Sequence, residues 1–304
     1  MMHARQLQYD HSHFFDDLAP MLSGVDIAIA NAEFTLAGLP YTGYPAFSAP
    51  DSYLKSILDA GVDVLLTANN HILDKGSAGL ERTLKQYPVF TGSGLDENQY
   101  KRNNPLILSR KGIRIALVNF TYGTNAGAQR DYPKVSRMVK KEISAQMKRA
   151  RECADFVIVL PHWGEEYVLR HNASQQEWAE WLVEKGADAI IGAHPHVVQD
   201  TAVIRGVPVV YSTGNAVSNM SAVNTRLGLA VTLKLVRDPQ SGRKEVCGPQ
   251  LHYTWCTLPG KKTDSFRPVL VEEQEGRRDD WLDKSDYDNM ISTLERVKKA
   301  TGTE

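Results

Sequence analysis

The sequence predicts an α/β protein in which an antiparallel sheet is stacked on a mostly parallel sheet. Up to about residue 197, short apolar runs alternate with amphipathic helical segments, which is the pattern of β-α-β units. Beyond that point, apolar runs are separated only by turn sequences such as Arg205-Gly206, which is typical of antiparallel strands. With 304 residues and 42% hydrophobic content, the chain can bury a large core.

The alternating part opens with a helix over residues 14–22 and a first clear strand over 25–30. A loop rich in Gly, Pro and Tyr covers 38–50, and Asp51 caps the helix that follows. The further elements expected in this part are a helix over 51–60, a strand over 62–66, a helix over 78–86, a strand over 89–91, a hairpin of 106–109 with 114–119, a helix over 134–153, a strand over 156–160, a helix over 174–185 and a strand over 189–191.

The second part is expected to consist of strands and one terminal helix. We predict one compact domain over 1–260, with a strand and helix appendage over 261–304 packed on it. Cys247 and Cys256 could pair across a hairpin, although three cysteines are too few for a disulfide framework or a zinc ribbon. The expected elements are strands over 198–204, 207–212, 227–236 and 245–257, an edge strand over 266–272 and a helix over 286–299.

Charge and hydropathy argue against two classes of partner. The net charge of −1 gives no electrostatic footprint for nucleic acid or an anionic membrane. No apolar run reaches the length of a membrane span, and the N-terminal residues lack a signal-peptide pattern. The sequence therefore assigns no cellular location, and association with the cell envelope stays open.

Polar side chains of metal-ligand type follow five of the predicted strands at the point where each strand ends. Because the carboxyl ends of parallel strands meet at one edge of a sheet, these side chains are expected to converge there. A carboxylate, an amide and several imidazoles form a mixed O/N donor set that suits manganese, iron or zinc better than calcium or magnesium. Each residue alone also has a structural reading, since loop amides form turns and an acid can cap a helix. Four of the strands are followed by the candidate ligands and acid, Glu33, Asn70, His71, His162, His194 and His196, and the fifth is followed by Asn215.

These strand ends carry a resemblance to a known family. Five blocks, in order and spacing over roughly residues 1 to 220, resemble the signature blocks of the CapA-like capsule (poly-γ-glutamate) synthesis family. The resemblance implies the calcineurin-like metallophosphoesterase fold, a four-layer α/β/β/α sandwich of two mixed sheets with a two-metal site. The blocks are Asn31-Ala32-Glu33, Thr67-Ala68-Asn69-Asn70-His71, Pro161-His162-Trp163-Gly164-Glu165, Gly192-Ala193-His194-Pro195-His196 and Tyr211-Ser212-Thr213-Gly214-Asn215.

The resemblance also implies roles for individual residues. Glu33 would be the carboxylate that bridges two divalent ions, and His71 the acid or electrostatic stabiliser near the leaving group. One ion would be completed by Asn70, His162 and His194, and the other would include His196. The candidate substrate contacts are Asn69, Glu165 and Asn215.

The start of the chain departs from the family pattern. The family begins with a strand that ends in Gly-Asp, shortly before a stretch like Met1-Met2-His3. We therefore expect the first strand of the fold and one Asp ligand to precede Met1, and we regard His3 as a further candidate ligand.

Two functions are expected from this reading. The first is a metal-dependent hydrolase that cuts a phosphoester or γ-glutamyl amide in capsule or poly-γ-glutamate metabolism, with an anionic polymer or a phosphoester as substrate. The alternative is a non-catalytic accessory protein that binds anionic polymer or a membrane-bound synthase and has an incomplete metal site.

Overall fold

The central strands are buried on both faces, and their alternating side chains enter two different cores. We describe a computed structural model, which covers residues 4–127 and 131–303. In β8 (Phe156–His162), Val157 and Val159 pack with the helices, whereas Ile158 and Leu160 face a second sheet. The same alternation in the neighbouring strand β6 (Ile113–Thr121) requires a sheet on one side and helices on the other.

The larger sheet has six strands in the order β10-β11-β9-β8-β6-β5. Its four inner strands run parallel, and the two edge strands are antiparallel to their neighbours. Its other members are β5 (Leu106–Arg110), β6 (Ile113–Thr121), β9 (Ala189–Ile191), β10 (Thr201–Ile204) and β11 (Val207–Val210).

Two three-stranded sheets form the facing layer. One is parallel, with β1 (Ile29–Asn31), β2 (Val64–Leu66) and β3 (Phe90–Thr91). The other is antiparallel, with β12 (Leu227–Arg237), β13 (Lys244–Thr257) and β14 (Arg267–Leu270). Side chains of β2 and β12 share one core cluster with β6, β8 and β9, so both small sheets lie against the large one.

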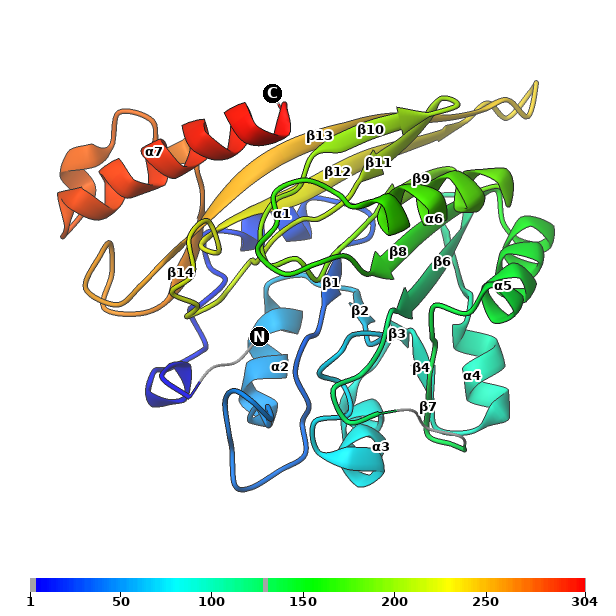
Figure 1. Cartoon of the computed structure of the whole chain (residues 1–304), viewed down its shortest axis with the longest axis horizontal. Coiled ribbons are helices and arrows are strands. Elements are labelled where there is room, and N and C mark those ends of the chain that lie inside the picture. Colours follow the sequence, from blue (N-terminus) through cyan, green and yellow to red (C-terminus); the bar gives the residue numbers. More distant parts are fainter. Residues whose placement is uncertain (1–3, 128–130, 304) are drawn as a thin grey trace.

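Helices cover the two outer faces (Figure 1). The large sheet is covered by α5 (Lys140–Cys153) and α6 (Ala173–Glu184). The facing layer is covered by α2 (Asp51–Asp59), α3 (Gly76–Gln86) and the terminal helix α7 (Lys284–Thr301). The molecule is thus the four-layer α/β/β/α sandwich that the family resemblance implies. In the described ranges, no helix combines the length and apolar character needed to cross a membrane.

The terminal helix α7 is attached by both packing and charge. Met290 and Val297 enter the core beneath β12 and β13. Arg226 binds Asp286 through two hydrogen bonds of 2.6 Å each, and its guanidinium lies 4.3 Å from the centre of the Trp255 ring. Such a bidentate pair fixes the orientation of the helix on the sheet.

One sequence prediction about sheet membership is wrong. The strands expected over 198–204 and 207–212 do not join the antiparallel sheet, because β11 pairs in parallel with β9 and carries β10 to the edge of the large sheet. The turn at Arg205-Gly206 predicts only that β10 and β11 pair with each other. The near-continuous apolar run of β11 is what favours an inner position in a parallel sheet.

Several local predictions also change. The helix expected over 14–22 is the short α1 (Ala19–Ser23), and the one expected over 134–153 begins at Lys140, because β7 (Lys134–Val135) pairs with β4 (Ser93–Gly94). The helix α4 (Glu97–Asn103), capped by Asp96, was not predicted. Cys247 and Cys256 are free and lie on the same strand, β13, so they cannot bridge a hairpin.

The side chain of Asn119, in β6, joins the two layers. Its Oδ1 accepts a hydrogen bond of 2.8 Å from the backbone N–H of Ala68, in the turn after β2. Its Nδ2 donates to the carbonyl of Leu160 in β8, at 2.7 Å. The carboxyl ends of β2 and β8 are thereby fixed relative to each other.

Gly92 leaves the room that this carboxamide requires, and replacing it should destabilise the fold. The β-carbon of Gly92→Ala would lie 2.1 Å from Asn119 Oδ1 and 2.5 Å from the nitrogen of Ala68, at a φ of +104°. We expect the free energy of unfolding to fall by roughly 3 kcal/mol. Gly112→Ala is the matched control, because φ is +78° there and nothing lies within 4 Å. Its expected loss in chemical denaturation is about 1 kcal/mol, and equal losses would contradict the role given to Asn119.

Candidate metal centre

The six strand-end residues meet at one edge of the two facing sheets. Glu33 follows β1, Asn70 and His71 lie in the turn after β2, His162 ends β8, and His194 and His196 follow β9. All six are buried, with at most 6% of their surface exposed. Two sheets therefore supply one cluster, because their carboxyl ends lie side by side.

The imidazoles are in mutual contact. Ring centres lie 4.8 Å apart for His162 and His194, and 5.9 Å apart for His194 and His196. The Nε2 atom of His162 lies 2.9 Å from the Oδ1 atom of Asn70. The Nε2 atom of His196 lies 3.7 Å from Oε1 of Glu33.

Several nitrogen and oxygen atoms of this cluster that could coordinate a metal have no hydrogen-bond partner. Within the described residues, Nδ1 of His162, Nδ1 of His194 and Oε1 of Glu33 are buried and unpartnered. Buried polar atoms are normally satisfied, so each unpartnered atom suggests a missing ligand. A carboxylate, an amide oxygen and neutral imidazoles are an appropriate donor set for a borderline divalent ion, and the residues present fit such an ion.

Burial keeps the imidazoles in the form that binds metal. Removal from water, together with the neighbouring His196 and His71 rings, lowers the pKa of His194 to about 3. The pKa of His162 also lies well below its usual value, because of burial and then the adjacent imidazoles. Both rings are neutral at neutral pH, as metal coordination requires.

The loop after β9 holds both of its histidines in an unusual backbone conformation. His194 has a φ of 106° and His196 a φ of 57°, values that non-glycine residues rarely adopt. Asn215 fixes the second ring, since its Oδ1 accepts from Nδ1 of His196 at 3.0 Å and its Nδ2 donates to the His196 carbonyl at 3.2 Å. In this arrangement Asn215, expected to contact substrate, orients a candidate ligand.

His71 has an acidic partner. Its Nδ1 lies 2.7 Å from Oδ2 of Asp74, and both side chains are buried. The same Asp74 oxygen accepts the backbone N–H of Phe47 at 2.8 Å, and the Phe47 ring lies 4.6 Å from the imidazole. These contacts direct the other ring nitrogen of His71 away from Asp74 and leave it available for proton transfer.

Glu166 joins the cluster, although sequence reasoning selected its neighbour Glu165. The ligand atoms of Glu166, His194 and His196 all lie within 4.8 Å of one another. The side chain of Glu165 instead lies 3.4 Å from Nδ2 of Asn172. Both acids are exposed, and two adjacent acids give no sequence signal for which of them lies beside the histidines.

Two other predicted residues have different surroundings. Asn69 is fully buried, donates to the Ala32 carbonyl at 2.9 Å and accepts the N–H of His71 at 3.1 Å, so it shapes the turn. His3 lies outside the described residues. The strand and the Asp expected before Met1 stay predictions.

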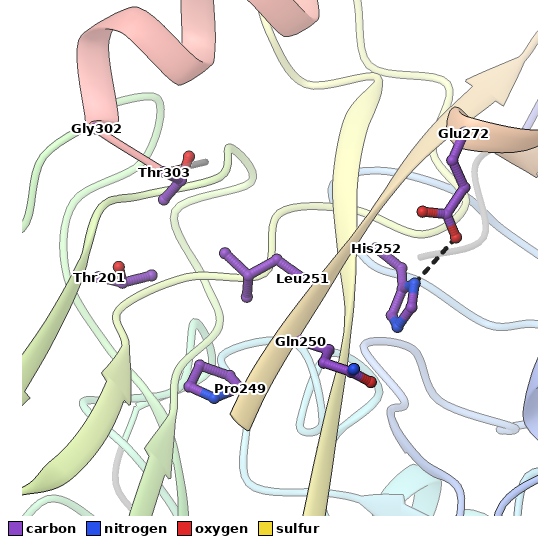
Figure 2. Close-up of a pocket in the computed structure, with 8 residues that line it drawn as sticks. All are labelled: Thr201, Pro249, Gln250, Leu251, His252, Glu272, Gly302 and Thr303. Atoms are coloured by element: carbon purple, nitrogen blue, oxygen red, sulfur yellow. Dashed lines mark hydrogen bonds and ion pairs between the residues drawn. The ribbon is translucent and has the colours of Figure 1, made fainter. Parts of the chain in front are cut away.

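A surface cavity of about 640 Å³ lies elsewhere, between β10, β13 and the end of α7. Figure 2 shows His252 and Glu272 paired on one side of it, with Nδ1 and the carboxylate 3.0 Å apart. No candidate metal ligand from the described residues lines this cavity.

Comparison with known proteins gives consistent sequence matches. A family model described as bacterial capsule synthesis protein PGA_cap matches residues 1–220. Capsule biosynthesis protein CapA of Bacillus anthracis is 30% identical over 235 residues, which cover 72% of this chain and 57% of that protein. PGA biosynthesis protein CapA of Bacillus subtilis is 31% identical over 228 residues, which cover 72% and 59%. The chain thus spans less than two thirds of the length of these relatives.

More distant matches are weaker. A probable polyglutamine synthesis accessory protein of Mycobacterium tuberculosis is 26% identical over 200 residues, which cover 59% of this chain and 52% of that protein. A hypothetical protein from Thermus thermophilus is structurally similar, with a TM-score of 0.48 and 18% sequence identity. The match covers 88% of this chain and 95% of that protein. A putative 5'-nucleotidase from Staphylococcus aureus has a TM-score of 0.48 and 14% sequence identity. The match covers 74% of this chain and 44% of that protein.

The low pKa values of the buried imidazoles predict acid sensitivity of the metal-free protein. Below the usual histidine pKa of 6.5, the unfolded chain binds protons at His194 that the folded chain, with a pKa of about 3 there, does not. The contribution of neutral His194 to the free energy of unfolding is therefore fully present above pH 6.5 and is lost as the pH drops toward 3. Denaturation across this range should show a shallower dependence of the unfolding free energy on pH for His194→Gln than for the unmodified protein. The same dependence in the two proteins would refute the low pKa of His194.

Proposed function

The chain belongs to the bacterial capsule synthesis protein family, and we propose that it is a divalent-metal-dependent hydrolase. The observation that carries the proposal is the burial of three touching imidazoles beside a carboxylate and an amide, with several donor atoms unpartnered. A structural core would satisfy these atoms, whereas a ligand site leaves them available.

We assign the residues to two positions. Asn70, His162 and His194 would hold one ion, and His196 would contribute to the other. Glu33 lies 3.7 Å from His196 and would be shared by the two positions, and Glu166 would be an additional ligand on the side of His194 and His196. When bound, such ions supply Lewis acidity and lower the pKa of coordinated water.

His71 would give a proton to the leaving group. Its Nδ1 donates to Asp74, so the proton that is transferred would come from Nε2. Asp74 fixes the tautomer and the ring orientation, and its charge stabilises the positive charge of the ring before transfer. Phe47 limits rotation of the imidazole from one side.

The substrate proposed is an anionic capsule or poly-γ-glutamate polymer, or a phosphoester linked to its synthesis. The names of the Bacillus relatives place those proteins in capsule and PGA biosynthesis. The bond cut would be a phosphoester or a γ-glutamyl amide, because either presents an oxygen that a metal centre can polarise.

A second candidate is a non-catalytic accessory that binds polymer or a membrane-bound synthase. It is favoured by the name of the mycobacterial relative, which calls that protein an accessory of polyglutamine synthesis. The two candidates differ in turnover. An accessory would bind poly-γ-glutamate without cutting it, with or without metal.

Metal analysis with an activity assay tests the proposal. The purified protein should hold about two manganese, iron or zinc ions per chain and hydrolyse bis(p-nitrophenyl) phosphate or a γ-glutamyl amide. His194→Ala should lose metal and turnover while circular dichroism stays unchanged, and His252→Ala, a histidine outside the cluster, should keep both. A protein without metal, or a His194→Ala variant with full metal content, would contradict the assignment.

His71→Gln should separate chemistry from metal binding. We expect the metal content to be retained and kcat to fall about 10²- to 10⁴-fold on a substrate with a poor leaving group. The decrease should be smaller with p-nitrophenolate, which needs no proton to leave. Equal decreases on the two substrates would show that His71 does not act as the acid.

A further inference from the structure

The segment 122–127 lies against the candidate centre and belongs to none of the five sequence blocks. The backbone N–H of Tyr122 donates to the carbonyl of His162 at 2.9 Å. The N–H of Asn125 donates to the carbonyl of Asn70 at 2.8 Å. The segment is thus fastened at two points to candidate ligands, through main-chain bonds that side-chain substitutions leave in place.

Arg137 stabilises the same segment through hydrogen bonds to two of its residues. Its Nη2 atom donates to Oγ1 of Thr124 at 2.8 Å and to the carbonyl of Gly127 at 2.5 Å. The segment is therefore positioned before any ligand arrives, which reduces the entropy lost on binding.

Tyr122 covers the imidazole pair. Its ring centre lies 4.6 Å from that of His194, and its ring is nearly parallel to His162 at 6.5 Å, with an angle of 10° between the planes. It is nevertheless 48% exposed, whereas the two histidines are at most 6% exposed. The phenol therefore reaches from the buried cluster to solvent.

Asn125 lies beside His71 and Asn70. Its Nδ2 lies 3.3 Å from Nδ1 and 3.5 Å from Nε2 of His71, and its Oδ1 lies 3.4 Å from Nδ2 of Asn70. These contacts are long, and Nδ1 of His71 is already paired with Asp74, so the N–H groups of the Asn125 carboxamide can hydrogen-bond a ligand. Asn125 is exposed, whereas His71 and Asn70 are buried.

We propose that Tyr122 and Asn125 bind the substrate, by hydrogen-bonding the phosphoryl or carbonyl oxygen next to the bond that is cut. The proposal rests on the function proposed above. Both side chains are exposed and the six strand-end residues beside them are buried, so a molecule that approaches the buried cluster past this segment meets them first. Both are neutral donors, so they bind an oxygen beside Glu33 and Glu166 without forming an ion pair with either carboxylate, and their contribution is insensitive to salt.

Binding of inorganic phosphate to the manganese-loaded protein tests this role directly. By isothermal titration calorimetry, Tyr122→Phe and Asn125→Ala should each raise the Kd for phosphate about three- to tenfold, as expected for one lost hydrogen bond. The ratio of each variant's Kd to the Kd of the unmodified protein should be the same at low and high salt. The KM for bis(p-nitrophenyl) phosphate should rise in parallel, while manganese content and thermal stability stay at the level of the unmodified protein.

Tyr132→Phe and Asn98→Ala are the matched controls, because both residues are exposed and lie outside the cluster. Neither should change the Kd. Unchanged phosphate binding in Tyr122→Phe and Asn125→Ala, with metal and turnover intact, would overturn only this inference. Loss of manganese from either variant would also overturn it, because that residue would then act through a ligand. An unmodified protein that neither holds metal nor turns over substrate would overturn the proposed function, and this inference with it.

Discussion

The carboxamide of Asn119 sets the geometry on which the candidate centre depends. It is buried, and it links the turn after β2 in one layer to β8 in the other. Two sheets that met only through apolar side chains could slide against each other, because apolar contacts have no direction. The hydrogen bond from Ala68 to Asn119 crosses between the layers and has a fixed direction, and the bond to Leu160 holds the same carboxamide in place within the large sheet. Beside this link, Asn70 and His162 lie 2.9 Å apart.

The cluster that this geometry creates is unfavourable without a ligand. Neutral imidazoles lie against one another, donor atoms have no partners, and the loop after β9 carries two histidines at positive φ. Each of these features costs free energy, and each is common where a fold is built around a binding site. The surrounding core, in which strands are buried on both faces, is large enough to hold the cluster in place.

His71 and His196 have different hydrogen-bond partners, and this distinguishes their proposed roles. His71 donates to a carboxylate, Asp74, which can stabilise a positive charge on the ring during proton transfer. His196 donates to a neutral amide, Asn215, which orients the ring without adding charge. The first arrangement suits an acid, and the second suits a ligand whose other nitrogen must stay unprotonated.

The sequence by itself determined the strands that end in polar residues, the burial of those strands and the identity of six residues that meet. It did so because an apolar run followed by a polar turn is a local pattern, and the carboxyl ends of parallel strands lie at one edge wherever those strands are placed. Only the tertiary structure decided that β11 pairs with β9, that Glu166 rather than Glu165 lies beside His194 and His196, and that Tyr122 and Asn125 lie over the cluster. Each of these outcomes depends on contacts between segments far apart in the chain or on the conformation of one turn. Such contacts leave no periodic signal in the sequence, because periodicity reports only which face of one element is buried.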